Sequence, residues 1–315
     1  MRLGPFRKYF IKGGNPRSLG VNLKSLSGVI SLIPTPLMEK GGLDVESLEK
    51  VIDYQFENGC HGVGVLAGIG EGYLMQGREW TKTVETAVDR VNGRGPLIVG
   101  CAAMGTGAAV DLVKEAADLG ADAILAFNPM AFRRYTVEET YMHFKAQAEV
   151  SDLDLLPYAR DEDLIHPEVI KRLVDEGLVR HMKYGYHSCD ILRQITSLTG
   201  DRLLRFCGAD TWTLRYLLLG CQGIMTATAA IFPKENVELL RLVKAGKIEE
   251  ARRLWYEKFL PWNDAGFHEN WQWAHKYALK LMGLIKSDAM APPQARGAEY
   301  QLAEVESLLK YLGKI

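Results

Sequence analysis

One strand–helix–strand unit near the start of the chain decides the fold: GVISLIPTPLMEKGGLDVESLEKVIDYQFENGCHGVGVL, residues 28–66. The apolar run 28–33 predicts a buried strand, and residues 43–58 carry apolar side chains at helical spacing. Gly59 marks the end of this helix, and residues 62–66 predict the next strand. Two strands joined by a helix form the repeat from which α/β folds are built.

The same alternation continues along the chain and predicts eight strands, each followed by a helix. Several strands are apolar almost throughout, as in a parallel sheet that is buried on both faces. Eight repeats favour an α/β fold of the TIM (β/α)8 barrel type over an open doubly wound sheet. No Gly-x-Gly-x-x-Gly motif follows a strand, which disfavours a nucleotide-binding fold. The expected strands are residues 28–33, 62–66, 96–100, 123–127, 154–158, 179–183, 204–207 and 223–227.

Three segments are predicted: an N-terminal extension (1–27), the barrel (28–245) and an additional C-terminal helical region packed on the barrel (246–315). The extension is basic, has no acidic residue and lacks the apolar core of a secretory signal. We interpret it as an arm that packs on a neighbour, with a cleaved organelle address as the alternative. Beyond the barrel we expect helices at 248–260, 267–282 and 297–312, with tryptophans that pack helices together rather than line a ligand site: Trp255, Trp262, Trp271 and Trp273.

Composition excludes several classes of partner. The chain has 315 residues and a formal net charge of −1, which indicates neither a nucleic-acid partner nor an anionic membrane surface. No stretch is long and apolar enough to span a bilayer. The 5 cysteines contain no Cys-x-x-Cys pair and the histidines lack metal-ligand spacing. We therefore expect a cytoplasmic protein without a metal or cofactor.

Only one predicted strand ends in a lysine. TIM-barrel chemistry takes place at the C-terminal ends of the strands, and Lys183 ends the sixth. Every other lysine lies in the extension, on a helix or in a loop, where a solvated ammonium is expected. Burial in a barrel mouth lowers the pKa of a lysine and gives a free amine that attacks ketones. The alternatives are a lysine paired with a carboxylate and one that binds phosphate.

Other strand ends supply candidate partners for Lys183. Tyr158 ends the neighbouring fifth strand, where its phenol would transfer protons as a carbinolamine loses water. Arg160 follows and is a candidate for binding a carboxylate, with a surface ion pair as the alternative. Thr226, at the end of the eighth strand, completes the predicted substrate-binding residues. Asp210 is expected to cap a helix.

From about residue 28 to the C-terminus, the chain resembles the dihydrodipicolinate synthase / N-acetylneuraminate lyase family of class I aldolases and dehydratases. The resemblance implies a TIM barrel with an appended helical region, assembled as a homotetramer or homodimer. It also implies that Lys183 is the Schiff-base lysine and that Tyr158 is the proton-transferring phenol. It rests on ordered landmarks: Pro34-Thr35-Pro36-Leu37, Gly70-Glu71, Pro129, Tyr158, Lys183, Gly208-Ala209-Asp210 and Gly223-Ile224-Met225.

The segment after the second strand departs from the family pattern. The family usually has Gly-Thr-Thr-Gly-Glu, whose hydroxyl relays protons, whereas this chain has Ala67-Gly68-Ile69-Gly70-Glu71. The backbone amides of Gly68 and Ile69 are still expected to bind the carboxylate of a 2-oxo acid, and Glu71 is expected to be structural. The change argues against dihydrodipicolinate synthase itself. An aromatic or apolar aldehyde partner is suggested by Ile69, Phe132, Tyr184 and Tyr186.

We predict a Schiff-base-forming lyase that acts on a pyruvate-type 2-oxo acid. Aldol cleavage or condensation, hydratase-aldolase chemistry and dehydration share an imine at Lys183, and the sequence does not choose between them. One alternative is a catalytically weak family member that binds a 2-oxo acid and has a regulatory role, since the hydroxyl relay is missing. Another is an enzyme in which the lysine acts as a simple cation.

Overall fold

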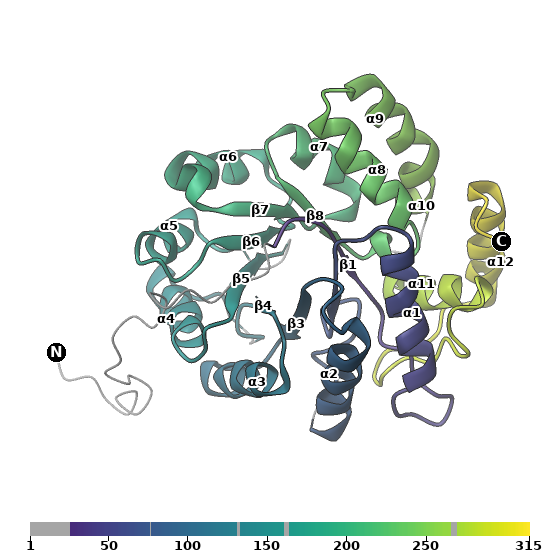
Figure 1. The fold of residues 1–315 in the computed structure, drawn as a ribbon, viewed down its shortest axis with the longest axis horizontal. Helices are drawn as coiled ribbons and strands as arrows, with labels where there is room; N and C mark the ends of the chain where they lie inside the picture. Colours follow the sequence, from purple (N-terminus) through teal and green to yellow (C-terminus); the bar gives the residue numbers. More distant parts are fainter. Residues whose placement is uncertain (1–25, 76, 131–132, 161–163, 266–269) are drawn as a thin grey trace.

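The computed structural model describes residues 26–315 except 76, 131–132, 161–163 and 266–269, so the predicted N-terminal extension lies almost wholly outside the described residues. The described strands form a closed parallel barrel in chain order, surrounded by helices (Figure 1). The predicted TIM barrel is thereby confirmed. The strands are β1 (Gly28–Leu32), β2 (Gly62–Val65), β3 (Leu97–Cys101), β4 (Ala123–Ala126), β5 (Asp154–Ala159), β6 (His181–Tyr184), β7 (Leu204–Cys207) and β8 (Gly223–Thr226).

Local signals in the sequence start and stop the helices around the barrel. Asp44 accepts a hydrogen bond from the backbone N–H of Ser47 at the first helix, and Gly120 ends the third in the left-handed conformation. Gly105 is the N-cap residue of that third helix. The helices are α1 (Val45–Glu57), α2 (Arg78–Val91), α3 (Thr106–Leu119), α4 (Val137–Ala148), α5 (Pro167–Asp175), α6 (Cys189–Thr199), α7 (Thr213–Leu218) and α8 (Pro233–Lys244).

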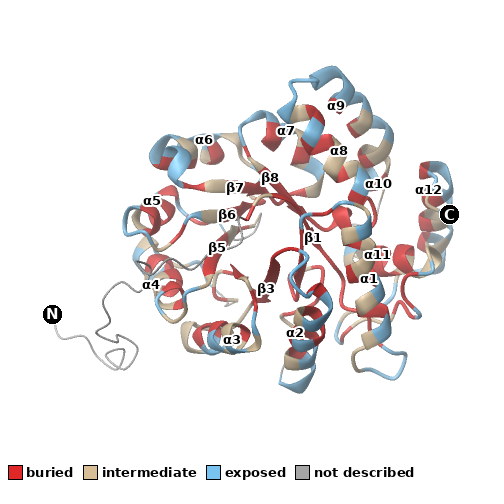
Figure 2. Cartoon of the chain, viewed as in Figure 1, coloured by how far each residue is buried: buried red, intermediate tan, exposed pale blue. Residues whose placement is uncertain are grey.

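The core has an inner and an outer layer. Successive residues of a strand point to opposite faces, so Val29 of β1 packs outward against the helices while Ile30 and Leu32 fill the barrel. Gly64 on β2 has no side chain, and a Cβ there would lie 2.4 Å from Cδ2 of Leu32. The glycine therefore leaves room for Leu32 near the barrel mouth. Figure 2 shows the strands buried and the outer helix faces exposed.

The sixth strand begins later than the sequence indicates. We expected residues 179–183, but β6 is His181–Tyr184. The backbone N–H of Val179 donates to the carbonyl of Leu173 at 3.3 Å, so Val179 still belongs to the turn that ends α5. Lys183 nevertheless keeps its place near the C-terminal end of the strand.

The C-terminal region consists of α9 (Ile248–Leu254), the π-helical segment η6 (Trp255–Phe259), α10 (Leu260–Asp264), α11 (Trp271–Leu281) and α12 (Glu299–Leu312). We expected one regular helix over 248–260, and this prediction is wrong because a π-helical segment interrupts the α-helix there. Pro261 has no N–H to donate, and the wider turn lies directly before it. Part of the predicted helix 267–282 lies outside the described residues.

This region covers one side of the barrel (Figure 1). Three of its tryptophans, Trp255, Trp262 and Trp273, are buried, which confirms their packing role. The indole N–H of Trp273 also donates to Asp288 at 2.9 Å. Short 3-10 helices of the described residues close the loops near the barrel: η3 (Gly200–Arg202), η4 (Asp210–Trp212) and η5 (Thr228–Ala230). Across the described part of the chain, no helix has both the length and the apolar character needed to cross a membrane.

Candidate active site

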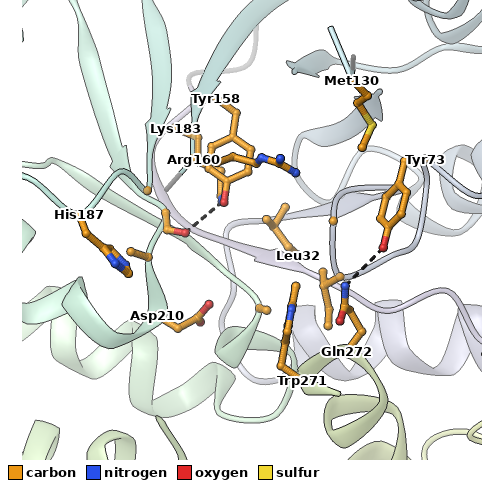
Figure 3. Close-up of a pocket in the computed structure, with 16 residues that line it drawn as sticks. Leu32, Tyr73, Met130, Tyr158, Arg160, Lys183, His187, Asp210, Trp271 and Gln272 are labelled. Atoms are coloured by element: carbon orange, nitrogen blue, oxygen red, sulfur yellow. Dashed lines mark hydrogen bonds between the residues drawn. The ribbon is translucent and has the colours of Figure 1, made fainter. Parts of the chain in front are cut away.

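A cavity of 530 Å³ opens at the C-terminal ends of the strands, where Lys183, Tyr158 and Arg160 meet (Figure 3). Five of the predicted site residues line it and come from loops or strand ends that lie far apart in the sequence, so the closed barrel is what brings them together. Described residues that line the cavity include Leu32, Gly68, Ile69, Tyr73, Met130, Tyr158, Arg160, Lys183, Gly208, Asp210, Trp271 and Gln272.

Lys183 is buried in the wall of this cavity. Its side chain is 3% exposed, and Nζ donates to the carbonyl oxygen of Gly208 at 3.0 Å. A Cβ on Gly208 would lie 2.6 Å from Cγ of the lysine, so only glycine leaves room for it. Burial lowers the pKa of Lys183 to about 7, although the carboxylate of Asp210 opposes this change. Near neutral pH a large share of the amine is therefore unprotonated.

Tyr158 lies directly beside the lysine. The two residues are partners in the β5–β6 register, and Nζ of Lys183 is 3.3 Å from the centroid of the tyrosine ring. Phe127 packs against the same ring edge-to-face, with a centroid distance of 5.6 Å. The ring face of Tyr158 therefore covers one side of the amine of Lys183.

The turn after β2 offers two backbone amides to the cavity. Gly68 and Ile69 line it, and within the described residues neither N–H donates to a protein acceptor. The hydroxyl of Thr35 donates to the carbonyl of Gly70 at 2.7 Å and fixes the turn. Two adjacent free N–H groups suit a carboxylate.

A buried ion pair holds this turn from behind. Glu71 and Lys276 are both 0% exposed and paired, so the expectation that every lysine but Lys183 is solvated is wrong for Lys276. The other oxygen of Glu71 accepts from the N–H of Ala291 at 2.6 Å, and the ammonium of Lys276 donates to Ala289 at 2.7 Å. The backbone of Glu71 is in the left-handed region, with a φ of 55°, and these contacts hold it there. The structural role expected for Glu71 agrees with this geometry.

Of the remaining predicted substrate-binding residues, Arg160 lines the cavity and Thr226 does not. The charge of Arg160 contributes to the lowered pKa of Lys183. Thr226 is fully buried with its hydroxyl 3.3 Å from that of Thr228, and Ala227 lines the cavity beside it. Asp210 caps a helix as expected, and the helix is η5 rather than η4, which begins at Asp210 itself. Its carboxylate accepts from the N–H of Thr228, the first residue of η5, at 2.8 Å, and it lines the cavity.

The residues that suggested an aromatic or apolar aldehyde do not all line the active-site cavity. Tyr184 is fully buried away from the cavity and donates to the carbonyl of Ser188 at 2.6 Å, so its proposed part in binding an aldehyde is wrong. Tyr186 lines a separate, smaller cavity of 240 Å³. Phe132 lies outside the described residues. Ile69 does line the active-site cavity.

Sequence reasoning missed the far wall of the cavity. Tyr73, Trp271 and Gln272 lie across from Lys183 in Figure 3. The phenol of Tyr73 accepts hydrogen bonds from Gln272 at 3.5 Å and from Gln294 at 2.7 Å. Trp271, expected to pack helices, is 36% exposed and lines the cavity instead. These C-terminal residues have no local signal, because only the return of α11 to the barrel places them here.

The comparisons with known proteins agree with this geometry. The model of the dihydrodipicolinate synthetase family matches residues 25–312. The chain belongs to this family. A 4-hydroxy-tetrahydrodipicolinate synthase of Thermodesulfovibrio yellowstonii is 32% identical over 283 residues, which cover 88% of this chain and 96% of that protein. The family consists of pyruvate-dependent Schiff-base aldolases and lyases, and the chain is an enzyme of this kind.

Two solved structures from the dihydrodipicolinate synthetase family extend the comparison. One, described as the first monomeric dihydrodipicolinate synthase variant, has a TM-score of 0.87 and 29% identity, and covers 93% of this chain and 99% of its own. The other is a chloride-inhibited dihydrodipicolinate synthase from Acinetobacter baumannii in complex with pyruvate. It has a TM-score of 0.84 and 27% identity, and covers 93% of this chain and 100% of its own.

Proposed function

We propose that Lys183 forms a Schiff base with pyruvate or a similar small 2-oxo acid. The observation that carries the proposal is a buried amine with a pKa of about 7 in the wall of a cavity. Among the described residues, no carboxylate lies within ion-pair distance of its Nζ. An amine of this kind is nucleophilic at neutral pH. The similar Acinetobacter baumannii enzyme, whose structure contains pyruvate, supports the choice of acid.

The covalent step begins when the amine nitrogen of Lys183 adds to the C2 carbonyl carbon. The carbonyl oxygen takes up a proton, which gives a carbinolamine. Its hydroxyl then leaves as water with a second proton, and the C=N bond forms. Tyr158 is the proposed proton donor and acceptor because it is paired with Lys183 in the β5–β6 register and lines the same cavity. The amides of Gly68 and Ile69 are proposed to hold the carboxylate, with Arg160 as a further cationic contact.

The imine then acts as an electron sink. Loss of a proton from C3 gives an enamine, and C3 attacks the carbonyl carbon of an aldehyde to form a C–C bond. The π bond of the aldehyde carbonyl opens, its oxygen takes up a proton to become a hydroxyl, and the C=N bond of the imine is restored. Water finally hydrolyses the imine and releases the free amine of Lys183. The reverse sequence cleaves an aldol, and an enamine that carries a β-hydroxyl expels it as water. The proposed enzyme is therefore a class I aldolase or lyase.

We also propose a homodimer or homotetramer in the cytoplasm. Support for the assembly comes from the frequency of closed homo-oligomers among soluble proteins. Support for the compartment comes from the cysteines at 60, 101, 189, 207 and 221, which are all free thiols in the structure. Light scattering coupled to size exclusion measures the assembly. A monomer would place this chain with the monomeric variant among its structural relatives.

Proton NMR of pyruvate in D2O tests the proposed chemistry. Enamine formation replaces the methyl protons of pyruvate by deuterium, and no aldehyde is needed. We expect exchange with the wild-type protein and only the buffer rate with Lys183→Met. Lys114→Met, on the exposed face of α3, is the matched control and exchanges like the wild type. A folded wild-type protein that exchanges no 2-oxo acid would overturn the proposal and favour a binding role.

A further inference from the structure

The hydroxyl of Tyr73 belongs to the wall of the active-site cavity, but the chemistry proposed for Lys183 does not use it. Tyr73 is half-buried and comes from the turn after β2 that also carries Gly68 and Ile69. Figure 3 shows its hydroxyl across the cavity from Lys183, beside the amide of Gln272. The turn itself lacks the hydroxyl side chain of the family pattern, so Tyr73 brings the nearest hydroxyl along the chain.

The C-terminal region holds Tyr73 at its side chain and at its backbone. Nε2 of Gln294 donates to the phenol oxygen at 2.7 Å, and Nε2 of Gln272 donates to it at 3.5 Å. Two residues before Tyr73, the buried carboxylate of Glu71 is paired with Lys276. The position of the hydroxyl is therefore fixed before a ligand binds.

The proton of this hydroxyl is available to a ligand. A phenol oxygen accepts hydrogen bonds through its lone pairs and donates one through its O–H. The two glutamines use the lone pairs, and among the described residues no acceptor takes the proton of Tyr73. Burial raises the pKa of Tyr73, so the hydroxyl is protonated at neutral pH. The cavity wall thus contains an uncharged donor that lacks an acceptor.

Arg160 lies within electrostatic range of both this hydroxyl and the reactive amine. Burial lowers the pKa of Lys183 and the charge of Arg160 adds to this effect, while the same charge opposes the raised pKa of Tyr73. In the proposed imine, C2 is bound to Lys183 and the carboxylate lies on the amides of Gly68 and Ile69, so C3 faces the rest of the cavity. Tyr73 lines this remaining space, through which an aldehyde approaches C3.

We propose that the hydroxyl of Tyr73 donates a hydrogen bond to the carbonyl oxygen of the aldehyde, the atom that becomes the 4-hydroxyl of the aldol. The inference deepens the proposed function and rests on it. When C3 attacks, the π electrons of the aldehyde carbonyl move onto its oxygen, and a neutral donor stabilises the growing negative charge. In the cleavage direction the same O–H binds the 4-hydroxyl of the aldol. An apolar group at this place would leave the phenol O–H without an acceptor.

The test uses two 2-oxo acids that differ by this one hydroxyl, so it does not depend on the rest of the aldehyde. 4-Hydroxy-2-oxopentanoate and 2-oxopentanoate each compete with pyruvate in the D2O exchange assay, and initial rates give their inhibition constants. The readout is the ratio of the constant for 2-oxopentanoate to that for 4-hydroxy-2-oxopentanoate. We expect a wild-type ratio of about ten or more, as for one hydrogen bond in a cavity.

Three variants assign this preference to the hydroxyl. Tyr73→Phe keeps the ring and removes the hydroxyl, so the ratio is expected to fall to about one. Gln294→Met removes the 2.7 Å hydrogen bond that orients the phenol, from a residue that is not among the described lining residues, and is expected to lower the ratio less. Tyr300→Phe, at a position on α12 that is 71% exposed, is the matched control and keeps the wild-type ratio. A purely structural role of Tyr73 would weaken the binding of both acids equally and leave the ratio unchanged.

Pyruvate exchange without a competitor separates failure of this inference from failure of the proposed function. A wild-type protein that exchanges pyruvate but binds the two acids equally would overturn the role of Tyr73 and leave the Schiff base standing. So would a Tyr73→Phe variant that retains the wild-type ratio. Absent exchange in the wild type would instead remove the proposed function on which the inference rests.

Discussion

Lys183 on β6 and Lys276 on α11 are 3% and 0% exposed, yet their surroundings are opposite. Lys276 forms an ion pair with Glu71 and donates to the carbonyl of Ala289. Lys183 has one backbone carbonyl and the face of Tyr158, and among the described residues it lacks a paired carboxylate. Burial lowers the pKa of both amines, but the charge of Glu71 favours the protonated form of Lys276.

The difference shows that burial alone does not make a lysine a nucleophile. A buried ammonium next to a carboxylate is an internal ion pair, whose two charges compensate each other. A buried amine without such a partner gives up its proton, and the folded chain bears the energetic penalty of its burial. The same substitution at the two positions should therefore change stability in opposite directions.

Lys183→Met is expected to have the largest effect. It removes the amine, so pyruvate exchange falls to the buffer rate. It also raises the free energy of unfolding at pH 7 by on the order of 2–4 kcal/mol, because each unit of the pKa shift corresponds to about 1.4 kcal/mol. Thermal and urea unfolding measure this change. A variant less stable than the wild type would contradict the account of Lys183 as a destabilised amine.

Lys276→Met is expected to act in the opposite direction. It leaves the carboxylate of Glu71 buried without a counter-charge, which costs about 3–5 kcal/mol of unfolding free energy. The control is the double variant Glu71→Leu/Lys276→Met, in which both charges are gone and much of the stability should return. If Lys276→Met has the same free energy of unfolding as the wild type in urea, the Glu71–Lys276 ion pair does not stabilise the Gly68–Ile69 turn.

Tyr158→Phe separates the hydroxyl from the ring. The ring still covers the amine, so the pKa of Lys183 should stay near its wild-type value. Loss of the proton-transferring hydroxyl should slow pyruvate exchange by about 10²-fold. The measurement is the exchange rate as a function of pH in both proteins. A shifted midpoint with an unchanged maximal rate would assign Tyr158 to tuning the amine rather than to proton transfer.

The pH dependence is the mildest of these effects. Exchange should rise about tenfold per pH unit up to about 7, where half of Lys183 is unprotonated, and level off above it. The stability penalty of Lys183 has a defined window as well. It is fully present below a pH of about 7 and disappears as pH rises toward the ordinary lysine pKa of 10.5, because only the unfolded chain stays protonated between them. The stability gap to Lys183→Met should narrow over that range, and a constant gap would contradict the assignment.

The sequence was sufficient to predict the buried position of Lys183 in the barrel mouth but not the burial of Lys276. Strand periodicity places Lys183 at a strand end, and the barrel rule turns that position into a site. Lys276 lies on a helix among apolar residues, with no local sign that Glu71 meets it. The positions of Trp271 and Gln272 in the cavity wall were not predicted for the same reason, since the return of α11 to the barrel depends on long-range packing. Tyr184 was misassigned because it directly follows Lys183 on β6. Neighbouring residues of a strand point to opposite faces, so Tyr184 points out of the barrel.

One measurement tests the central claim most directly: borohydride reduction of the protein in the presence of pyruvate, followed by peptide mass spectrometry of every lysine. Borohydride converts an imine into a stable amine and leaves a covalent mark on the lysine that formed it. The account predicts the mark on Lys183 and an unmodified Lys276, although both lysines are buried. A mark on Lys276 or on surface lysines only, or no mark on folded protein, would contradict it.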